Sequence, residues 1–275
     1  MFARICEGTE QMQKSNFLGG TGTVFWVLEG ILYTVFLTGD WCDFLGVLRI
    51  DGFHWYKYSS ICKYTALLIC VWYGCRCRRE KRNVQQKALC GVLLFAAAAD
   101  YFLLFTNCFI LGVCFFCLVQ VCYCLYFPGE KSRNGVWGMV IPGICMVLFV
   151  WCLMQTETSG DGAGWKGEKY GLILAAVFYG SLLVQNLVRI WKSSPPICIW
   201  GKMAILLLFL CDVHVALYNI EAVYITVKMS FWFQWWCEAA GVLMWLFYLP
   251  SQLCIVKCIQ GKIPINNRNV DKNLL

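Results

Sequence analysis

The sequence predicts an all-α membrane protein of eight transmembrane helices, and three observations lead to this fold class. Of the 275 residues, 60% are hydrophobic and only 14% are charged, whereas an ordinary soluble domain has about 25% charged residues. The apolar residues gather in eight stretches, each close to the roughly 20 residues that a helix needs to cross the hydrocarbon core. Basic residues collect in alternate loops between these stretches, as they do in multi-pass membrane proteins.

The predicted helices cover nearly the whole chain and leave no room for a soluble domain. Residues 1–22 are polar and lack the basic start, short apolar core and cleavage site of a signal peptide. We expect them to form a short cytoplasmic tail, followed by a transmembrane domain over 23–258 and a second cytoplasmic tail over 259–275. The predicted spans are 23–40, 58–76, 88–106, 107–127, 137–155, 169–192, 201–219 and 235–257.

The loops predict the orientation of the chain. The densest basic cluster, at 76–87, is predicted to be cytoplasmic by the positive-inside rule. Alternating outward from it, both termini are cytoplasmic and the Gly-rich loop 156–168 lies on the opposite side. The aromatic loop 41–57 is expected to lie along the bilayer surface.

The basic and cysteine residues have structural explanations. The net charge of +7 is accounted for by orientation signals and by contacts with anionic lipids, so nucleic acid is not an expected partner. The 19 cysteines lie mainly within the spans, where Cys behaves as a small apolar residue. Pairs such as Cys75 and Cys77 lack the spacing and the nearby His of a zinc site. We expect no metal and no cofactor.

Two carboxylates are predicted to lie deep in the membrane. From the helical rise of about 1.5 Å per residue, Asp100 lies roughly 18 Å and Asp212 roughly 17 Å from the cytoplasmic face. A charge at that depth costs a few kcal/mol, so it is seldom retained unless it faces a protein interior, a partner or a wet cavity. Asp100 and Asp212 are therefore the first candidates for functional residues.

The two aspartates belong to a short repeated pattern. Asp100 is followed seven residues later by Asn107, and Asp212 is followed in the same way by Asn219. Seven residues are close to two helical turns, so each Asn is expected on the same face as its Asp. The pattern indicates a weak internal repeat, which many membrane proteins contain.

Other polar side chains are predicted to reach the same depth. Lys63 lies roughly 8 Å from the outer face of the second span. Gln120 and Tyr123 share a face of the fourth span, and Tyr248 and Gln252 share a face of the eighth. Together with both aspartates they predict a polar cluster slightly to the outer side of the membrane midplane.

These motifs, in their order, resemble those of the YhhN, or lysoplasmalogenase-like, membrane proteins. Ala-Asp100-Tyr-Phe-Leu-Leu and Val-Gln120-Val-Cys-Tyr123 resemble the first signature of the family, and Lys63-Tyr-Thr resembles its Lys-Pro-Leu. Asp212-Val-His-Val-Ala-Leu and Trp245-Leu-Phe-Tyr-Leu-Pro-Ser-Gln252 resemble the second signature. The eight-helix layout of the family agrees with the predicted spans. Gln120 stands where the family often has His, so this position cannot transfer a proton as His does.

The resemblance implies hydrolysis of the vinyl ether of a lysoplasmalogen, which gives a fatty aldehyde and a glycerophospho head group. Such an ether is cleaved by protonation at carbon, followed by capture of an oxocarbenium ion by water. The reaction needs one protonated acid and a second carboxylate that activates water or stabilises the cation, and Asp100 and Asp212 are expected in these roles. The resemblance also implies a lysophospholipid substrate, with Lys63 contacting its phosphate or biasing one Asp toward its charged form.

Three other interpretations remain open at this stage. Both aspartates can hydrogen-bond between helices or pair with Lys63, and the amide and tyrosine side chains can join helices without any catalytic role. A proton-coupled transporter also retains carboxylates in repeated halves. An inactive lipid-binding protein of the same fold is the third interpretation, and Gln120 favours it.

Overall fold

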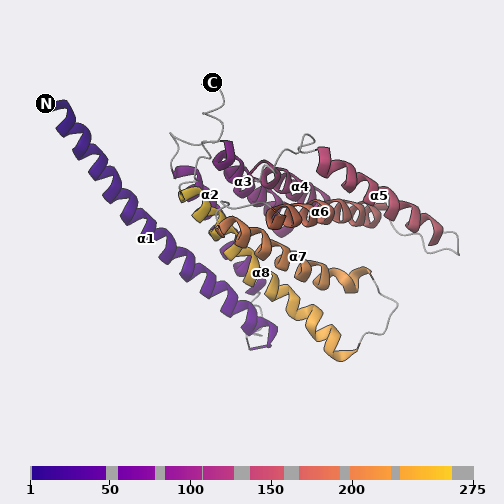
Figure 1. The fold of residues 1–275 in the computed structure, drawn as a ribbon. Coiled ribbons are helices and arrows are strands. Elements are labelled where there is room, and N and C mark those ends of the chain that lie inside the picture. Colours follow the sequence, from indigo (N-terminus) through magenta and orange to yellow (C-terminus); the bar gives the residue numbers. More distant parts are fainter. Residues whose placement is uncertain are drawn as a thin grey trace, which may run out of the picture. The chain divides into compact units, whose positions relative to one another are not determined.

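The part of the chain that the structure describes consists of eight α-helices (Figure 1). The structure is a computed structural model, and it describes residues 2–47, 55–77, 84–106, 108–126, 137–157, 167–192, 199–223 and 230–261. The predicted all-α fold class is confirmed. The helices are α1 (Phe2–Phe44), α2 (Trp55–Arg76), α3 (Val84–Phe105), α4 (Phe109–Tyr126), α5 (Trp137–Glu157), α6 (Gly167–Lys192), α7 (Ile199–Val223) and α8 (Phe231–Gln260).

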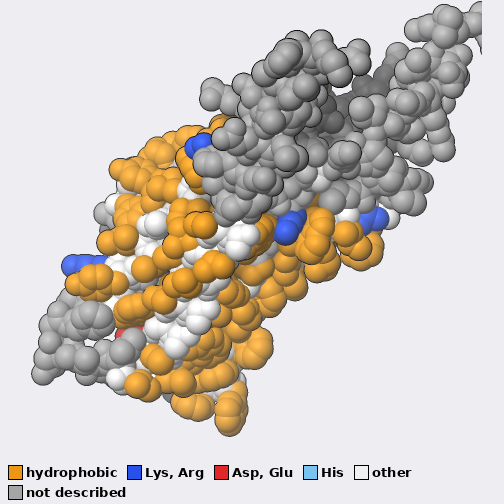
Figure 2. Space-filling model, turned by 90° about the vertical axis from the view of Figure 1, so that its left-hand side faces the viewer, with side chains coloured by type: hydrophobic (Ala, Val, Ile, Leu, Met, Phe, Trp, Pro, Cys, Tyr) orange, Lys and Arg blue, Asp and Glu red, His pale blue; other side chains and the backbone are white. Residues whose placement is uncertain are grey.

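The apolar character of these helices makes the chain a multi-pass membrane protein. Six of the described helices contain a stretch long and apolar enough to cross a bilayer: Gly22–Phe44, Val84–Phe105, Phe109–Tyr126, Gly171–Lys192, Ile199–Asn219 and Phe231–Gln260. Large hydrophobic side chains such as Ile31, Leu94 and Trp191 are exposed. On the face drawn in Figure 2, the described side chains are mostly hydrophobic and few are charged. Such a surface suits lipid tails rather than water.

The first helix is longer than the sequence predicted. It begins at Phe2 and ends at Phe44, so the predicted tail over 1–22 continues the helix, and the predicted interfacial loop 41–57 loses residues at both ends. Within 2–21, residues with good helix propensity such as Glu, Gln and Lys predominate over helix breakers, and Pro is absent. Hydropathy locates the membrane-spanning part of a helix, not its ends, and here the apolar span starts only at Gly22.

The helices divide into two compact units, residues 1–69 and 70–275. The first unit holds α1 and most of α2. In the second unit, α3 packs with α4 and α7 packs with α8, and α6 contacts α4, α5 and α7. Each aspartate helix, α3 or α7, therefore packs closely against the helix that follows it, as α7 and α8 do in Figure 1.

Helices α4 and α6 run in the same direction, so that residues further along α4 contact residues further along α6. The rings of Phe116 and Tyr179 lie 5.7 Å apart, and eight residues further along α4, Cys124 Sγ accepts a hydrogen bond from Arg189 at 2.9 Å. This parallel arrangement is the one expected when α5 crosses the membrane in the opposite direction between them. It aligns one face of α6 with the polar face of α4.

Candidate functional site

Asp212 receives a short hydrogen bond from a neighbouring helix. The Tyr179 hydroxyl on α6 donates to Oδ2 of Asp212 on α7, at 2.5 Å. The Asp212 side chain is half-buried. A hydroxyl that donates to a carboxylate stabilises its charged form, so α6 provides a specific partner for this carboxylate.

The amides of Gln120 and Asn186 hold Tyr179 from the other side. Asn186 Nδ2 donates to the backbone oxygen of Gln120 at 2.8 Å and to its side-chain Oε1 at 3.0 Å. Gln120 Nε2 in turn donates to the Tyr179 hydroxyl oxygen at 3.4 Å. Gln120 and Asn186 are fully buried. A chain of hydrogen bonds therefore runs from Asn186 through Gln120 and Tyr179 to Asp212.

Asp100 lies in a different environment. Its side chain is 5% exposed, and its electrostatic neighbours are the Tyr248 hydroxyl on α8 and the Asp212 carboxylate. Among the described residues, neither Asp100 Oδ2 nor the Tyr248 hydroxyl makes a hydrogen bond of good geometry, although the two groups lie close enough for a loose one. Buried polar atoms without partners are uncommon in native proteins, and each one requires an explanation such as a catalytic role or an unobserved water.

Apolar side chains connect the two aspartate environments. The Phe116 ring lies between two tyrosines, with its centroid 5.7 Å from that of Tyr179 and 6.3 Å from that of Tyr248. Cys211 is buried and interacts with both carboxylates. We call Asp100, Asp212, Gln120, Tyr179 and Tyr248 the aspartate cluster, and five different helices (α3, α4, α6, α7 and α8) supply its members.

Of the remaining predicted site residues, some lie near the aspartate cluster and others do not. Tyr123 is fully buried and interacts electrostatically with Asp212. Gln252 is buried on α8, one turn beyond Tyr248. Asn219 is exposed and its amide donates to the Val215 backbone oxygen of its own helix at 2.7 Å, so it does not join the aspartate cluster. Asn107 lies outside the described residues.

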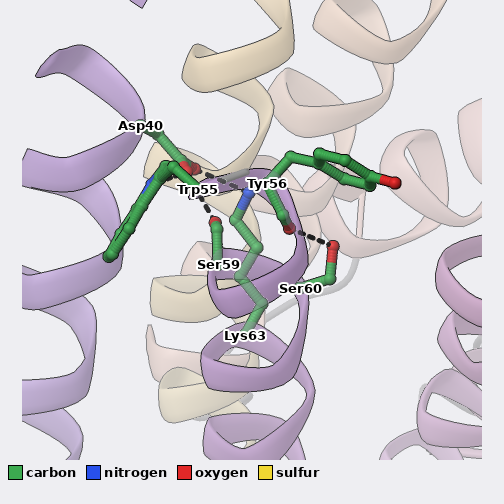
Figure 3. Close-up of polar contacts among 6 residues, drawn as sticks. All are labelled: Asp40, Trp55, Tyr56, Ser59, Ser60 and Lys63. Carbon is green, nitrogen blue, oxygen red and sulfur yellow. Dashed lines mark hydrogen bonds and ion pairs between the residues drawn. The ribbon is translucent and has the colours of Figure 1, made fainter. Parts of the chain in front are cut away.

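Lys63 forms an ion pair that the sequence analysis did not predict. Its ammonium lies 2.6 Å from Asp40 Oδ2, and the two side chains are 10% and 9% exposed. The other carboxylate oxygen of Asp40 accepts from Trp55 Nε1 at 3.0 Å and from the Ser59 hydroxyl at 2.5 Å. Figure 3 shows these three α2 side chains converging on Asp40 of α1. The expected phosphate contact of Lys63 would have to compete with this carboxylate.

Sequence reasoning missed Tyr179, Asn186 and the Asp40 partner of Lys63. Tyr179 and Asn186 are seven residues apart, a spacing that places both on one face of a helix. This spacing was the available signal, but it gained meaning only once α6 was found beside α4. Asp40 stands at the end of a predicted span, where an interfacial charge is unremarkable.

The fold and the buried aspartate cluster together define a multi-pass helical membrane protein with a polar interior. The sequence profile of the YhhN family matches residues 58–259, well over half of the chain, and the chain belongs to the YhhN family. The resemblance noted in the motifs is thereby confirmed. No curated protein and no solved structure matches the chain. The matched range contains every member of the aspartate cluster, as well as Lys63, but not Asp40.

Proposed function

We propose that this protein hydrolyses the vinyl ether bond of lysoplasmalogens and releases a fatty aldehyde and a glycerophospho head group. The observation that carries the proposal is that Asp100 and Asp212, from two helices far apart in sequence, belong to one cluster inside one helical unit. Tyr179 donates to Asp212 at 2.5 Å, Tyr248 lies beside Asp100, and the Phe116 ring lies 5.7 Å from the ring of Tyr179 and 6.3 Å from that of Tyr248. Membership of the YhhN family supports it, because the motifs that gave the resemblance include both aspartates.

The chemistry requires two carboxylates in different protonation states. Protonation of the vinyl ether at carbon creates an oxocarbenium ion, and water must then attack this ion. One carboxylic acid supplies the proton, and a second, charged carboxylate stabilises the cation and accepts a proton from the water. When two carboxyl groups lie close together in a buried site, one of them is favoured in its neutral form. The aspartate cluster supplies such a pair.

The position of the cluster suits a lipid substrate. A lysolipid resides in the bilayer, and the aspartates lie on helices whose outer surfaces are apolar. Phe116, Tyr179 and Tyr248 provide aromatic faces beside the carboxylates, and these faces suit the alkenyl chain next to the reacting double bond.

The test is release of aldehyde from a vinyl-ether lysolipid by the purified full-length protein. A saturated alkyl-ether lysolipid of the same chain length is the matched control substrate, because it lacks the double bond that is protonated. We expect Asp100→Asn and Asp212→Asn each to lose at least about a hundredfold in rate while still binding the lysolipid. A folded Asn variant that releases aldehyde at nearly the parent rate would contradict the proposal.

A non-catalytic lipid-binding protein of the same fold is the second candidate, and Gln120 favours it. Gln120 cannot transfer a proton, and its amide is held by Asn186 and Tyr179. The same assay separates the two candidates, because a binding protein takes up the vinyl-ether lysolipid without releasing aldehyde.

A further inference from the structure

The two aspartates of the cluster differ in their hydrogen-bond donors. Tyr179 donates to Asp212 at 2.5 Å, whereas the Oδ2 atom of the more deeply buried Asp100 makes no hydrogen bond of good geometry among the described residues, and the Tyr248 hydroxyl beside it is a looser donor. An ionised carboxylate only accepts hydrogen bonds, while a protonated carboxylic acid also has a proton to donate. The difference between the two sites therefore bears on their protonation.

The hydrogen-bond chain behind Asp212 has a fixed direction. A backbone carbonyl can only accept, so the nitrogen of Asn186 must face the Gln120 backbone oxygen. The same nitrogen donates to Gln120 Oε1, which turns the Gln120 NH₂ group toward Tyr179. With its oxygen accepting from Gln120, the hydroxyl of Tyr179 directs its own proton at Asp212.

We propose that Asp100 is the protonated acid of the site, that Asp212 is its charged carboxylate, and that Tyr179 is the positioning residue that maintains this division. The proposal rests on the function proposed above and names the role of each aspartate within it. Every hydrogen bond in the chain from Asn186 points toward Asp212, and this arrangement stabilises a negative charge there. With Asp212 charged, a second charge on the neighbouring Asp100 is disfavoured.

This division gives a reaction that balances and restores both residues. Asp100 transfers its proton to the vinyl carbon remote from oxygen, the double bond is lost and an oxocarbenium ion forms. Asp212 removes a proton from water, and the hydroxide adds to the oxocarbenium carbon to give a hemiacetal. The Asp100 carboxylate then takes the hemiacetal hydroxyl proton while Asp212 returns its proton to the ether oxygen. The carbon–oxygen bond breaks, aldehyde and alcohol leave, and water is the only other reactant.

The orphan hydroxyl of Tyr248 fits the same scheme. It lies beside Asp100 and acts on its carboxyl group as a loose donor, yet among the described residues neither it nor Asp100 Oδ2 makes a hydrogen bond of good geometry. A protonated Asp100 can donate to the Tyr248 oxygen until substrate arrives, whereas a charged Asp100 would attract the hydroxyl proton as Asp212 attracts that of Tyr179. Asp100 and Tyr248 are thus the members of the cluster that, in the described part of the chain, no hydrogen bond of good geometry already occupies.

The experiment is labelling of the full-length protein in vesicles with dicyclohexylcarbodiimide, an apolar reagent that reacts with protonated carboxyl groups. Peptide mass spectrometry then locates the modified residue. At neutral pH we expect modification of Asp100 and little at Asp212. Tyr179→Phe removes the donor to Asp212 and should raise labelling there about tenfold or more. Gln120→Met removes the donor to the Tyr179 hydroxyl oxygen and should also raise the labelling of Asp212, but by less than Tyr179→Phe does.

Tyr73→Phe is the matched control, because the Tyr73 hydroxyl accepts a hydrogen bond from Gln260 at 2.8 Å outside the aspartate cluster. It should leave the labelling ratio unchanged. Labelling of Asp212 rather than Asp100 in the parent protein overturns the assignment, and so does a folded Tyr179→Phe variant with the parent ratio. Labelling does not depend on turnover. If Asp100 is labelled in preference to Asp212 but no aldehyde is released, the proposed function is wrong and the assigned protonation states stand. If aldehyde is released but Asp212 is labelled in preference to Asp100, only the assignment of the two aspartates is wrong.

Discussion

Asp40 and Asp212 are both stabilised by hydrogen-bond donors from a neighbouring helix, but the donors differ in charge. Asp40 has an ammonium, an indole and a hydroxyl, which together match a full negative charge. Asp212 has a tyrosine hydroxyl, which stabilises its charge without neutralising it. A carboxylate neutralised by Lys63 suits a structural role, whereas one that retains its charge suits catalysis.

At the residue scale, we predict that Lys63→Met lowers the stability of the protein strongly. It leaves the Asp40 carboxylate buried without its cation, and breaking a buried pair in this way costs about 3–5 kcal/mol. The double variant Asp40→Asn with Lys63→Met should recover much of the loss, since the amide oxygen still accepts from Trp55 and Ser59. Thermal unfolding in detergent measures both changes. Lys57→Met on the exposed face of α2 is the control, with an expected effect within about 0.5 kcal/mol.

Asn186→Leu is predicted to destabilise the contact between α4 and α6. It leaves the side-chain Oε1 of Gln120 without its donor, which costs about 1–3 kcal/mol for a buried polar group. The exposed Asn219, which bonds only within its own helix, provides the matched substitution Asn219→Leu. A fall in the unfolding midpoint for the second variant as large as for the first would show that the amide chain does not hold these helices.

At the scale of whole helices, glycine permits close approach at several positions, and Gly112 lies opposite the residue that precedes Asp100. A Cβ atom at Gly112 on α4 would lie 2.7 Å from the Leu103 side chain and 3.2 Å from the Ala99 backbone oxygen on α3. Ala99 directly precedes Asp100, so the spacing between these two helices also sets the position of the acid. At one end of this helix pair, the Cys108 backbone N–H donates to the Thr106 hydroxyl at 3.1 Å.

We therefore predict opposite effects for the same substitution at two glycines. Gly112→Ala forces the Leu103 side chain to move and presses on the Ala99 backbone oxygen. It should cost about 1–3 kcal/mol through overpacking, with a loss of aldehyde release because the adjoining Asp100 shifts. Gly180→Ala on α6 meets nothing within 4 Å and should be neutral or stabilising by up to about 1 kcal/mol through helix propensity. Unfolding midpoints and initial rates of both variants provide the comparison, and equal losses would contradict it.

The sequence predicted features that depend on neighbouring residues, and the structure adds contacts between residues far apart in the chain. A lone Asp in an apolar run, such as Asp100, is conspicuous because of its immediate neighbours, and so is each apolar span. Tyr179 resembles the other aromatic residues of a membrane helix until its neighbour across the helix interface is known. Asn219 shares its predicted face with Asp212, but in the described part of the chain it is exposed and bonds only within its own helix. Packing between helices far apart in sequence determines whether Tyr179 and Asn219 reach the aspartate cluster, and the local sequence does not show this packing.

At the scale of the whole molecule, exposed apolar side chains and basic loops favour one arrangement in the membrane. The apolar spans are consistent with a multi-pass protein, and the cluster of basic residues at 76–87 predicts which side faces the cytoplasm. The orientation is a prediction from charge, because the loops that carry it lie mostly outside the described residues.

The orientation predicts the accessibility of two introduced cysteines. A thiol reagent that cannot cross the membrane should reach Gly162→Cys from outside intact cells and should miss Asn83→Cys until the membrane is opened. The parent protein, with its own cysteines, gives the background. The reverse pattern would contradict the cytoplasmic placement of both termini and would invert the depths assigned to Asp100 and Asp212.

The short connection between α3 and α4 has a consequence for synthesis of the chain. Asp100 leaves the ribosome on a helix that would enter lipid with an unpaired carboxyl group, a costly state. The next helix, α4, has 18 residues, and at about 5–20 residues per second it is completed within about 1–4 seconds. The pair can then enter the bilayer as one hairpin, with Gly112 already against α3 and the carboxyl group turned inward. Lengthening this connection would therefore prolong the exposure of Asp100 during insertion and would reduce yield before it altered the finished protein.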